Sequence, residues 1–282
     1  MSASAPIETV AGGYNSPEGP AFAENGDFYF VNWLSSSIVR IGPGGAPGEF
    51  ANTGGVPAGL AFHRDGTLYC ADEGEHIHGV IKIDSTGHIT RFVDSFEGRP
   101  LNGANDLVFD RNGVLYFSDP WRSSRDNPIG GFYRAFADGR VEQIDSGLAF
   151  PNGVAINADA TAVFLAETPH NRILRYELGP DGAVGRRTEF ARLSGRSGPD
   201  GMAFAADSRL FIAQHGNGRV TVLDPEGREV EHIGMPGRQP TNVAFGGPNF
   251  DALTITEVET ASVYRIPIGV KGQPLYGGWQ HR

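Results

Sequence analysis

The chain has 282 residues, a formal net charge of −10 and no cluster of Lys or Arg. Nucleic-acid-binding faces and charge-based membrane contacts are usually basic, so we expect neither kind of partner. A single cysteine, Cys70, excludes an internal disulfide framework. The first ten residues carry no basic and apolar signal segment, and no apolar run approaches 18 residues, so a cytoplasmic protein is expected.

The composition favours an all-β fold over a helical one. The 40 glycines and 19 prolines indicate many tight turns, and no window has the 3.6-residue periodicity of a long amphipathic helix. Closed all-β folds of this length commonly form one domain. We therefore expect a single domain over residues 1–282, either monomeric or a homodimer.

A six-residue opening recurs six times along the chain. Consecutive openings begin 40 to 48 residues apart, as from Pro17 to Pro57 and from Pro151 to Pro199. The openings are PEGPAF (17–22), PAGLAF (57–62), ANDLVF (104–109), PNGVAI (151–156), PDGMAF (199–204) and PTNVAF (240–245). This period is that of a four-stranded propeller blade. A β-sandwich with coincidental spacing is the alternative.

Each opening is followed by a turn and by two further strands. Turns such as Asn112-Gly113 tolerate positive φ and favour hairpins. The second strands begin at Phe28, Leu68, Leu115, Val163, Leu210 and Leu253. The third strands are expected at 37–41, 80–83, 132–135, 173–176, 219–223 and 262–266. Little β-pattern remains after the last of them, so residues 7–10 are expected to supply the outer strand that closes the ring.

In a propeller the innermost strands line a central tunnel, so one column of the repeat forms a ring around the axis. The second column of the opening reads Glu18, Ala58, Asn105, Asn152, Asp200 and Thr241. Ala and Thr show that the scaffold does not need carboxylates or carboxamides there. The sequence therefore predicts that the other four residues converge for a purpose other than folding.

Four oxygen donors with no neighbouring basic residue predict a bound cation. Two buried carboxylates would otherwise repel each other and lose their hydration. An all-oxygen set suits Ca²⁺ best; Mg²⁺, Mn²⁺ and Fe²⁺ are alternatives, and Zn²⁺ fits less well without His or Cys. Turn or capping roles for these residues, or a purely structural ion, are the competing interpretations.

Two columns at the end of the second strand differ in kind. The first is polar in all six blades and is interpreted as structural; it reads Asn32, Asp72, Asp119, Glu167, Gln214 and Glu257. The second varies and is expected to shape the pocket rim; it reads Trp33, Glu73, Pro120, Thr168, His215 and Val258. With Asn105, we predict Glu73 and His215 as substrate contacts. Trp121 and Arg122, in the longest loop within a blade, are predicted to contact the substrate too.

These segments resemble the SMP-30/gluconolactonase (regucalcin-like) family. The resemblance covers nearly the whole chain and rests on SPEGPAF, NDLVFDRNGVLYFSDP, FPNGVAIN, GPDGMAFAADSRLFIA, TNVAFGG and ITEVETASVYR. It implies a six-bladed β-propeller with four-stranded antiparallel blades and a metal in the central tunnel. It further implies that Glu18, Asn105, Asn152 and Asp200 bind a catalytic divalent metal.

The resemblance also implies an activity. The commonest in the family is sugar-lactone hydrolysis, and related members hydrolyse organophosphates such as diisopropyl fluorophosphate. We therefore expect a hydrolase that opens a lactone by metal-activated water, with Asp200 as general base. Phosphotriester or aryl-ester hydrolysis is the first alternative, and a non-catalytic propeller stabilised by Ca²⁺ is the second.

Two departures from the family pattern fall where substrate would bind. Regucalcin-type members have an Arg two residues before the third-blade Asn, and this chain has Gly103 there. Many gluconolactonases read DPPYG after the third-blade strand, whereas this chain reads Asp-Pro-Trp-Arg over residues 119–122. Both differences leave the four metal-binding residues in place, but they make a plain glucono-lactone a less certain substrate.

Overall fold

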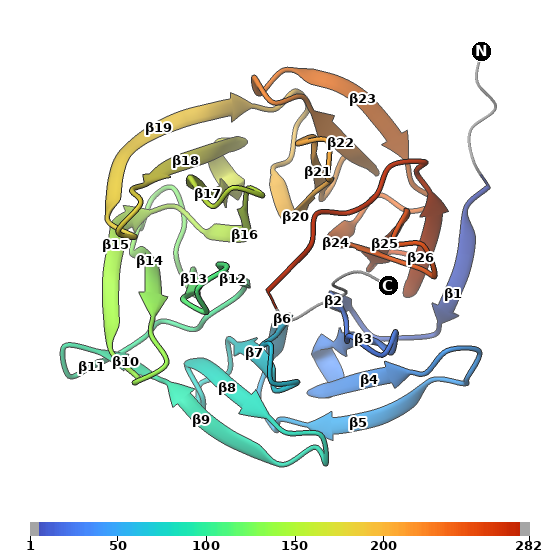
Figure 1. Ribbon diagram of the computed structural model, residues 1–282, viewed down its shortest axis with the longest axis horizontal. Coiled ribbons are helices and arrows are strands. Elements are labelled where there is room, and N and C mark those ends of the chain that lie inside the picture. The colour runs from blue at the N-terminus through green and yellow to red at the C-terminus, as the bar shows by residue number, and fades with distance from the viewer. Residues whose placement is uncertain (1–5, 277–282) are drawn as a thin grey trace.

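A computed structural model describes residues 6–276 and shows six four-stranded antiparallel sheets arranged as blades around a ring (Figure 1). The predicted six-bladed β-propeller is confirmed. The single-domain prediction spans 1–282, and residues 1–5 and 277–282 lie outside the described residues.

The blades repeat one order of strands from the tunnel outward. The first three blades contain β2 (Pro17–Phe22), β3 (Phe28–Asn32), β4 (Ser37–Ile41) and β5 (Gly48–Asn52); β6 (Pro57–Phe62), β7 (Leu68–Asp72), β8 (Gly79–Ile83) and β9 (Ile89–Val93); β12 (Leu107–Phe109), β13 (Leu115–Asp119), β14 (Gly130–Ala135) and β15 (Val141–Leu148). The next two contain β16 (Pro151–Ile156), β17 (Ala162–Glu167), β18 (Arg172–Leu178) and β19 (Val184–Arg192); β20 (Pro199–Phe204), β21 (Leu210–Gln214), β22 (Arg219–Leu223) and β23 (Glu229–Gly234).

The sixth blade joins the two ends of the chain. It contains β24 (Pro240–Gly246), β25 (Ala252–Glu257), β26 (Ser262–Pro267) and, outermost, β1 (Glu8–Gly12). Glu8 pairs with Arg265 and Gly12 with Ser262. The predicted closing strand is confirmed, displaced toward the C-terminus by one to two residues.

Three short elements lie outside the blade pattern. They are the 3₁₀ turns η1 (Trp33–Ser35) and η2 (Thr168–His170), and a hairpin of β10 (Ser95–Phe96) and β11 (Arg99–Pro100). None was predicted, because the hairpin strands are two residues long and carry no periodicity. No helix in residues 6–276 is long and apolar enough to cross a membrane.

The hydrophobic core lies between neighbouring blades. All five residues of β7, β13 and β21 are buried, as expected for short apolar strands covered on both faces. Phe30, Phe117 and Phe211 have no exposed surface. The inner strands contact one another in a closed circle through β2, β6, β12, β16, β20 and β24. This circle positions the start of each inner strand at one mouth of the tunnel.

The inner strands bend where they enter the tunnel, and glycine permits the bend. In β16 the register shifts between Pro151 and Val154, so Asn152 and Gly153 form a β-bulge. A Cβ on Gly153 would collide with the backbone carbonyl oxygen of Asp200. The bulge therefore brings two neighbouring blades into close backbone contact beside two predicted metal ligands.

Gly153→Ala is expected to destabilise the protein by about 1–3 kcal/mol, because the carbonyl it meets belongs to a buried strand that cannot move freely. The matched control is Gly234→Ala, at the end of β23, where an added Cβ meets nothing within 4 Å. Its effect on the free energy of unfolding should stay within about 0.5 kcal/mol. Urea unfolding measures both, and equal losses in the two variants would contradict the close blade contact.

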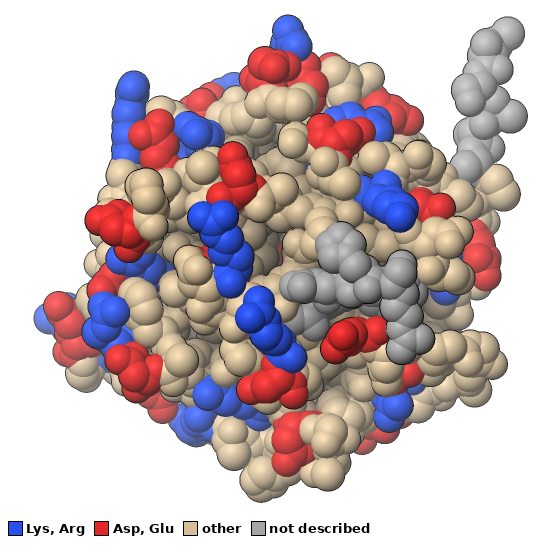
Figure 2. All heavy atoms as spheres, viewed as in Figure 1, with Lys and Arg blue, Asp and Glu red and all other residues tan. Residues whose placement is uncertain are grey.

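The segment after β26 crosses the face on which the inner strands end (Figure 1). Gly272 forms an isolated bridge with Ala205, and the backbone N–H of Gln273 donates to the Phe204 carbonyl over 3.0 Å. The Tyr276 ring contacts Phe109, with centroids 5.7 Å apart. On this same face, Figure 2 shows acidic and basic side chains interspersed rather than gathered by sign. The four predicted metal ligands lie at the opposite mouth, where the inner strands begin.

Candidate metal centre

The four predicted metal ligands come from four blades and lie at the same mouth of the tunnel. Glu18, Asn152 and Asp200 are each the second residue of an inner strand, β2, β16 and β20. Asn105 lies two residues before β12, which is shorter than the predicted 104–109. Its backbone N–H still donates to the Ser118 carbonyl over 3.0 Å, so the position relative to β13 is kept.

The two carboxylates of this set repel each other in a buried setting. Burial raises the pKa of Glu18 well above its usual range, and the nearby charge of Asp200 raises it further. Burial likewise raises the pKa of Asp200 well above its usual range, with Asp106 as the next cause. Among the described ion pairs, no Lys or Arg pairs with either carboxylate. A positive charge at the axis would relieve both shifts.

The carboxamide of Asn152 has a free acceptor. The residue is only 5% exposed, and its Oδ1 is buried without a hydrogen-bond partner among residues 6–276. The Asn152 side chain also interacts with Asp200, which leaves its amide nitrogen on the Asp200 side. A buried unpaired oxygen is costly, and a hard cation is the natural partner for it. The donor set therefore fits a divalent cation such as Ca²⁺.

A site of the zinc type is not apparent. Within the described part of the chain, no group of three or more His, Cys, Asp or Glu residues is arranged to hold a metal ion. The four predicted ligands do not form such a group, because two of them are asparagines. The oxygen-only donors favour a hard cation over Zn²⁺.

Glu73 contacts one of the predicted ligands directly. Asn105 Nδ2 donates to Glu73 Oε1 over 2.8 Å, and Trp33 Nε1 donates to Glu73 Oε2 over 3.3 Å. Burial raises the pKa of Glu73 to about 7, against the opposing effect of these two donors. The rim residues Trp33 and Glu73, predicted from the variable column, are thus linked to the ring of ligands.

Asp106 is a buried carboxylate that the sequence analysis missed. It follows Asn105, and its side-chain oxygens accept the backbone N–H groups of Leu107 and Val154, each over 2.9 Å. Burial raises its pKa to about 7. A signal was present in the third column of the opening, which is Gly in four blades but Asp106 and Asn242 in the other two.

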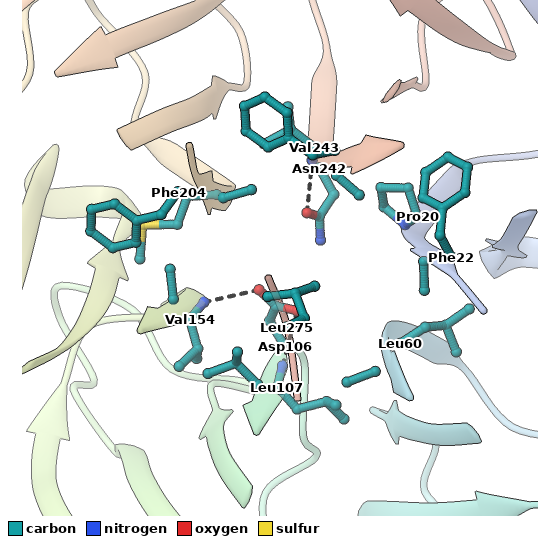
Figure 3. A pocket seen from close by; sticks show the side chains of 18 of the residues that line it. Pro20, Phe22, Leu60, Asp106, Leu107, Val154, Phe204, Asn242, Val243 and Leu275 are labelled. Carbon is teal, nitrogen blue, oxygen red and sulfur yellow. Dashed lines mark hydrogen bonds between the residues drawn. The ribbon is translucent and has the colours of Figure 1, made fainter. Parts of the chain in front are cut away.

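Asp106 and Asn242 form the polar end of a largely apolar cavity of about 100 Å³ within the tunnel (Figure 3). Leu60, Val154 and Phe204 contribute apolar walls, and the Asp106–Val154 hydrogen bond crosses between two blades. Gln273, Leu275 and Tyr276, which belong to the tail formed by residues 268–276 after β26, also line the cavity. The tail therefore helps to enclose the tunnel below the candidate metal centre.

Gly103 and Trp121 are close together at the rim. Gly103 has φ +147°, and a Cβ there would lie 2.9 Å from Trp121 Cβ and 2.9 Å from the Glu73 carbonyl oxygen. Trp121 Nε1 is buried without a hydrogen-bond partner among the described residues. The geometry thus explains the sequence departure: a long side chain at position 103 has no room beside Trp121.

The other two predicted substrate contacts differ in exposure. Arg122 pairs with Glu75, and both side chains are about two-thirds exposed. His215 follows β21 and is partly buried, which lowers its pKa. Neither is linked to the four ligands by a described contact, so their role in substrate binding stays a prediction.

Five of the six residues in the uniformly polar column bind backbone groups of a neighbouring loop, as predicted, whereas Asn32 Oδ1 is buried without a hydrogen-bond partner among residues 6–276. Asp119 accepts the backbone N–H groups of Asn102 and Gly103 over 3.0 and 2.7 Å. Glu167 accepts that of Ala149 over 2.8 Å, and Asp72 accepts that of Val56 over 2.8 Å. These bonds hold the loops that enter β6, β12 and β16, and so fix where those inner strands begin.

Comparison with known proteins adds a family match. A family model described as SMP-30/Gluconolactonase/LRE-like region matches residues 16–259. A diisopropyl-fluorophosphatase of Loligo vulgaris is 28% identical, over 92% of this chain and 91% of the relative. A gluconolactonase of Zymomonas mobilis is 28% identical, over 87% of this chain and 77% of the relative.

The fold also matches solved structures. A calcium-binding protein, regucalcin, from Agrobacterium tumefaciens superposes with a TM-score of 0.81 at 22% identity, over 95% of each chain. At that identity the likeness shows a shared fold. The six-bladed architecture is therefore common to this chain and a solved relative.

Proposed function

Because the chain belongs to the SMP-30/gluconolactonase/LRE-like family, we propose that it is a divalent-metal-dependent hydrolase that opens a lactone ring, with a sugar (aldono-) lactone as first candidate. The observation that carries the metal dependence is the buried, unpaired Oδ1 of Asn152 beside two carboxylates with raised pKa. A hard cation satisfies all three groups at once.

Glu18, Asn105, Asn152 and Asp200 would hold this cation, with Ca²⁺ as first choice from the all-oxygen donors. The calcium-binding title of the regucalcin structure supports that choice by analogy. When bound, the cation supplies Lewis-acid polarisation of the substrate carbonyl and stabilises the charge that develops on its oxygen.

The chain's own residues supply the proton chemistry and the enclosure. Asp200 accepts the proton from the attacking water, because it is a carboxylate at the ligand ring with no basic partner. Glu18 balances the second charge and takes no proton in the reaction. Trp33 and Trp121 narrow the mouth, and His215, whose pKa is lowered by burial, stays neutral near pH 7 and hydrogen-bonds the substrate.

Asp200→Asn tests the general-base role. Asparagine keeps an oxygen ligand but cannot accept the proton, so kcat should fall about 10²–10⁴-fold while Ca²⁺ still binds at saturating concentration. Stopped-flow lactone hydrolysis and calorimetric Ca²⁺ binding measure the two effects. Asp27→Asn, a buried aspartate paired with Arg40 in the turn after β2, is the control and should keep kcat. Full turnover of the Asp200 variant with metal bound would assign the base elsewhere.

A second candidate function is hydrolysis of phosphotriesters or aryl esters at the same site. Trp121 fills the space beside Gly103, which makes the mouth less polar than one carrying an arginine there. The diisopropyl-fluorophosphatase relative supports the same alternative. A third candidate is a non-catalytic propeller that the cation only stabilises.

A substrate panel separates the three candidates. It contains glucono-, xylono-, galactono- and alkyl lactones, diisopropyl fluorophosphate and aryl acetates, each with Ca²⁺, Mn²⁺, Fe²⁺, Zn²⁺ or Mg²⁺. The highest kcat/KM on an aldonolactone supports the proposal. A preference for the phosphorus or aryl esters supports the second candidate, and bound metal with no turnover supports the third.

A further inference from the structure

One of the four ligands has its side chain held by a carboxylate outside the ligand set. Asn105 Nδ2 donates to Glu73 Oε1 over 2.8 Å, and Trp33 Nε1 donates to Glu73 Oε2 over 3.3 Å. Trp33, Glu73 and Asn105 come from the first, second and third blades, in that order. They form a continuous path from the rim to the ligand ring.

The chemistry of this path selects one orientation of the carboxamide. An Asn side chain has a donor end and an acceptor end of nearly the same shape, and only the oxygen can bind a cation. An ionised Glu accepts hydrogen bonds and cannot donate them. Glu73 Oε1 therefore requires the amide nitrogen of Asn105 on its side, which leaves Oδ1 on the opposite side of the group.

We propose that Glu73 is a positioning residue that fixes the Asn105 carboxamide with its oxygen toward the cation, and that Trp33 in turn fixes Glu73. The inference rests on the proposed metal site and adds to it a residue that the four-ligand set does not contain. Support outside a metal's own ligands is a common requirement of metal sites in proteins.

The fold itself gives no reason for a glutamate at this position. The same column holds Trp33, Pro120, Thr168, His215 and Val258 in the other blades, so the blade tolerates apolar residues there. Glu73 is 3% exposed, and no Lys or Arg pairs with it among the described ion pairs. Burying a carboxylate without a counter-charge destabilises a fold. A purely structural role would therefore favour its replacement.

Glu73→Ala is expected to weaken Ca²⁺ binding about 10–100-fold, because Asn105 loses the partner that orients it. The melting temperature of the metal-free variant should equal or exceed that of the wild type, since a buried carboxylate without a counter-charge is removed. Glu73→Gln keeps an acceptor for Asn105 and should recover most of the affinity. Isothermal calorimetry on chelated protein and differential scanning calorimetry give the two readouts.

The two rim tryptophans provide a matched pair for the outer half of the path. Trp33 Nε1 donates to Glu73, whereas Trp121 Nε1 has no partner among residues 6–276. Trp33→Phe should weaken Ca²⁺ binding several-fold, and Trp121→Phe should leave it unchanged. Equal effects of the two substitutions on metal affinity would overturn the role given to Trp33.

The outcomes separate this inference from the proposed function. Unchanged Ca²⁺ affinity in both Glu73 variants, with tight binding in the wild type, would overturn the positioning role and leave the metal site standing. Wild-type protein that binds no divalent cation would overturn both. Should the alanine variant fold poorly, the tryptophan pair still decides, because Phe keeps an aromatic ring at each position and removes only the indole N–H that donates in Trp33 and has no partner in Trp121.

Discussion

Glu18→Gln should lower Ca²⁺ affinity by more than about 100-fold and remove most lactone hydrolysis at micromolar Ca²⁺. The substitution removes one of the two charges that the site offers to a cation, and a direct ligand should count for more than the roughly 10–100-fold of an outer-sphere residue. At the same time the melting temperature of the metal-free protein should rise, because the buried repulsion between Glu18 and Asp200 is gone. A substitution that weakens Ca²⁺ binding but raises the melting temperature of the metal-free protein identifies a residue that serves binding rather than folding.

Glu167→Gln is the matched control for this prediction. Glu167 is a buried glutamate that pairs with Arg172 and accepts the Ala149 N–H. Its replacement should lower stability and leave Ca²⁺ affinity unchanged. If Glu18→Gln instead destabilised the metal-free protein as the control does, Glu18 would be a structural residue.

Removal of the metal should make stability strongly dependent on pH. Asp106 and Glu73 have pKa values of about 7 in the folded chain, and that of Asp119 is about 6, in each case chiefly because of burial. In the unfolded chain these carboxyls titrate near pH 4. Between about pH 4 and pH 7 the folded state therefore binds more protons than the unfolded state, and the free energy of unfolding falls as the pH rises.

The melting temperature of chelated protein should therefore drop by about 5 °C or more between pH 5 and pH 8. Saturating Ca²⁺ should raise it again at pH 8, where the carboxylates are ionised and the site binds best. Asp106→Asn should flatten the pH profile of the chelated protein. A melting temperature that is the same at pH 5 and pH 8 without metal would contradict the burial of these carboxylates without a counter-charge.

The fold was predictable because each blade repeats two local signals. The six-residue openings and the turns that follow them recur six times, and every blade strand with a predicted start except β12 begins within a residue or two of it. Circular closure then turns one column of the repeat into a ring. The convergence of Glu18 and Asp200 followed from that symmetry rather than from any local motif.

The features that were missed depend on contacts between blades that do not repeat. Asp106 belongs to a column of glycines, and its hydrogen bond to the Val154 N–H exists only because the third and fourth blades meet there. The tail after β26 carries no strand periodicity, yet Gln273 Nε2 donates to the Ile156 carbonyl over 2.9 Å. The exposed pairing of Arg122 with Glu75 likewise depends on a side-chain conformation that spacing does not specify, and the substrate contact of Arg122 stays a prediction.

The most direct test of metal-dependent hydrolysis is a titration of chelated protein with Ca²⁺. Aldonolactone hydrolysis and bound metal are measured in the same samples. We expect no turnover without metal and full recovery when one equivalent is bound. The same titration of Glu18→Gln should require far more Ca²⁺. Full turnover by the metal-free wild type would contradict metal-dependent hydrolysis, because the four predicted metal ligands would then have no part in the reaction.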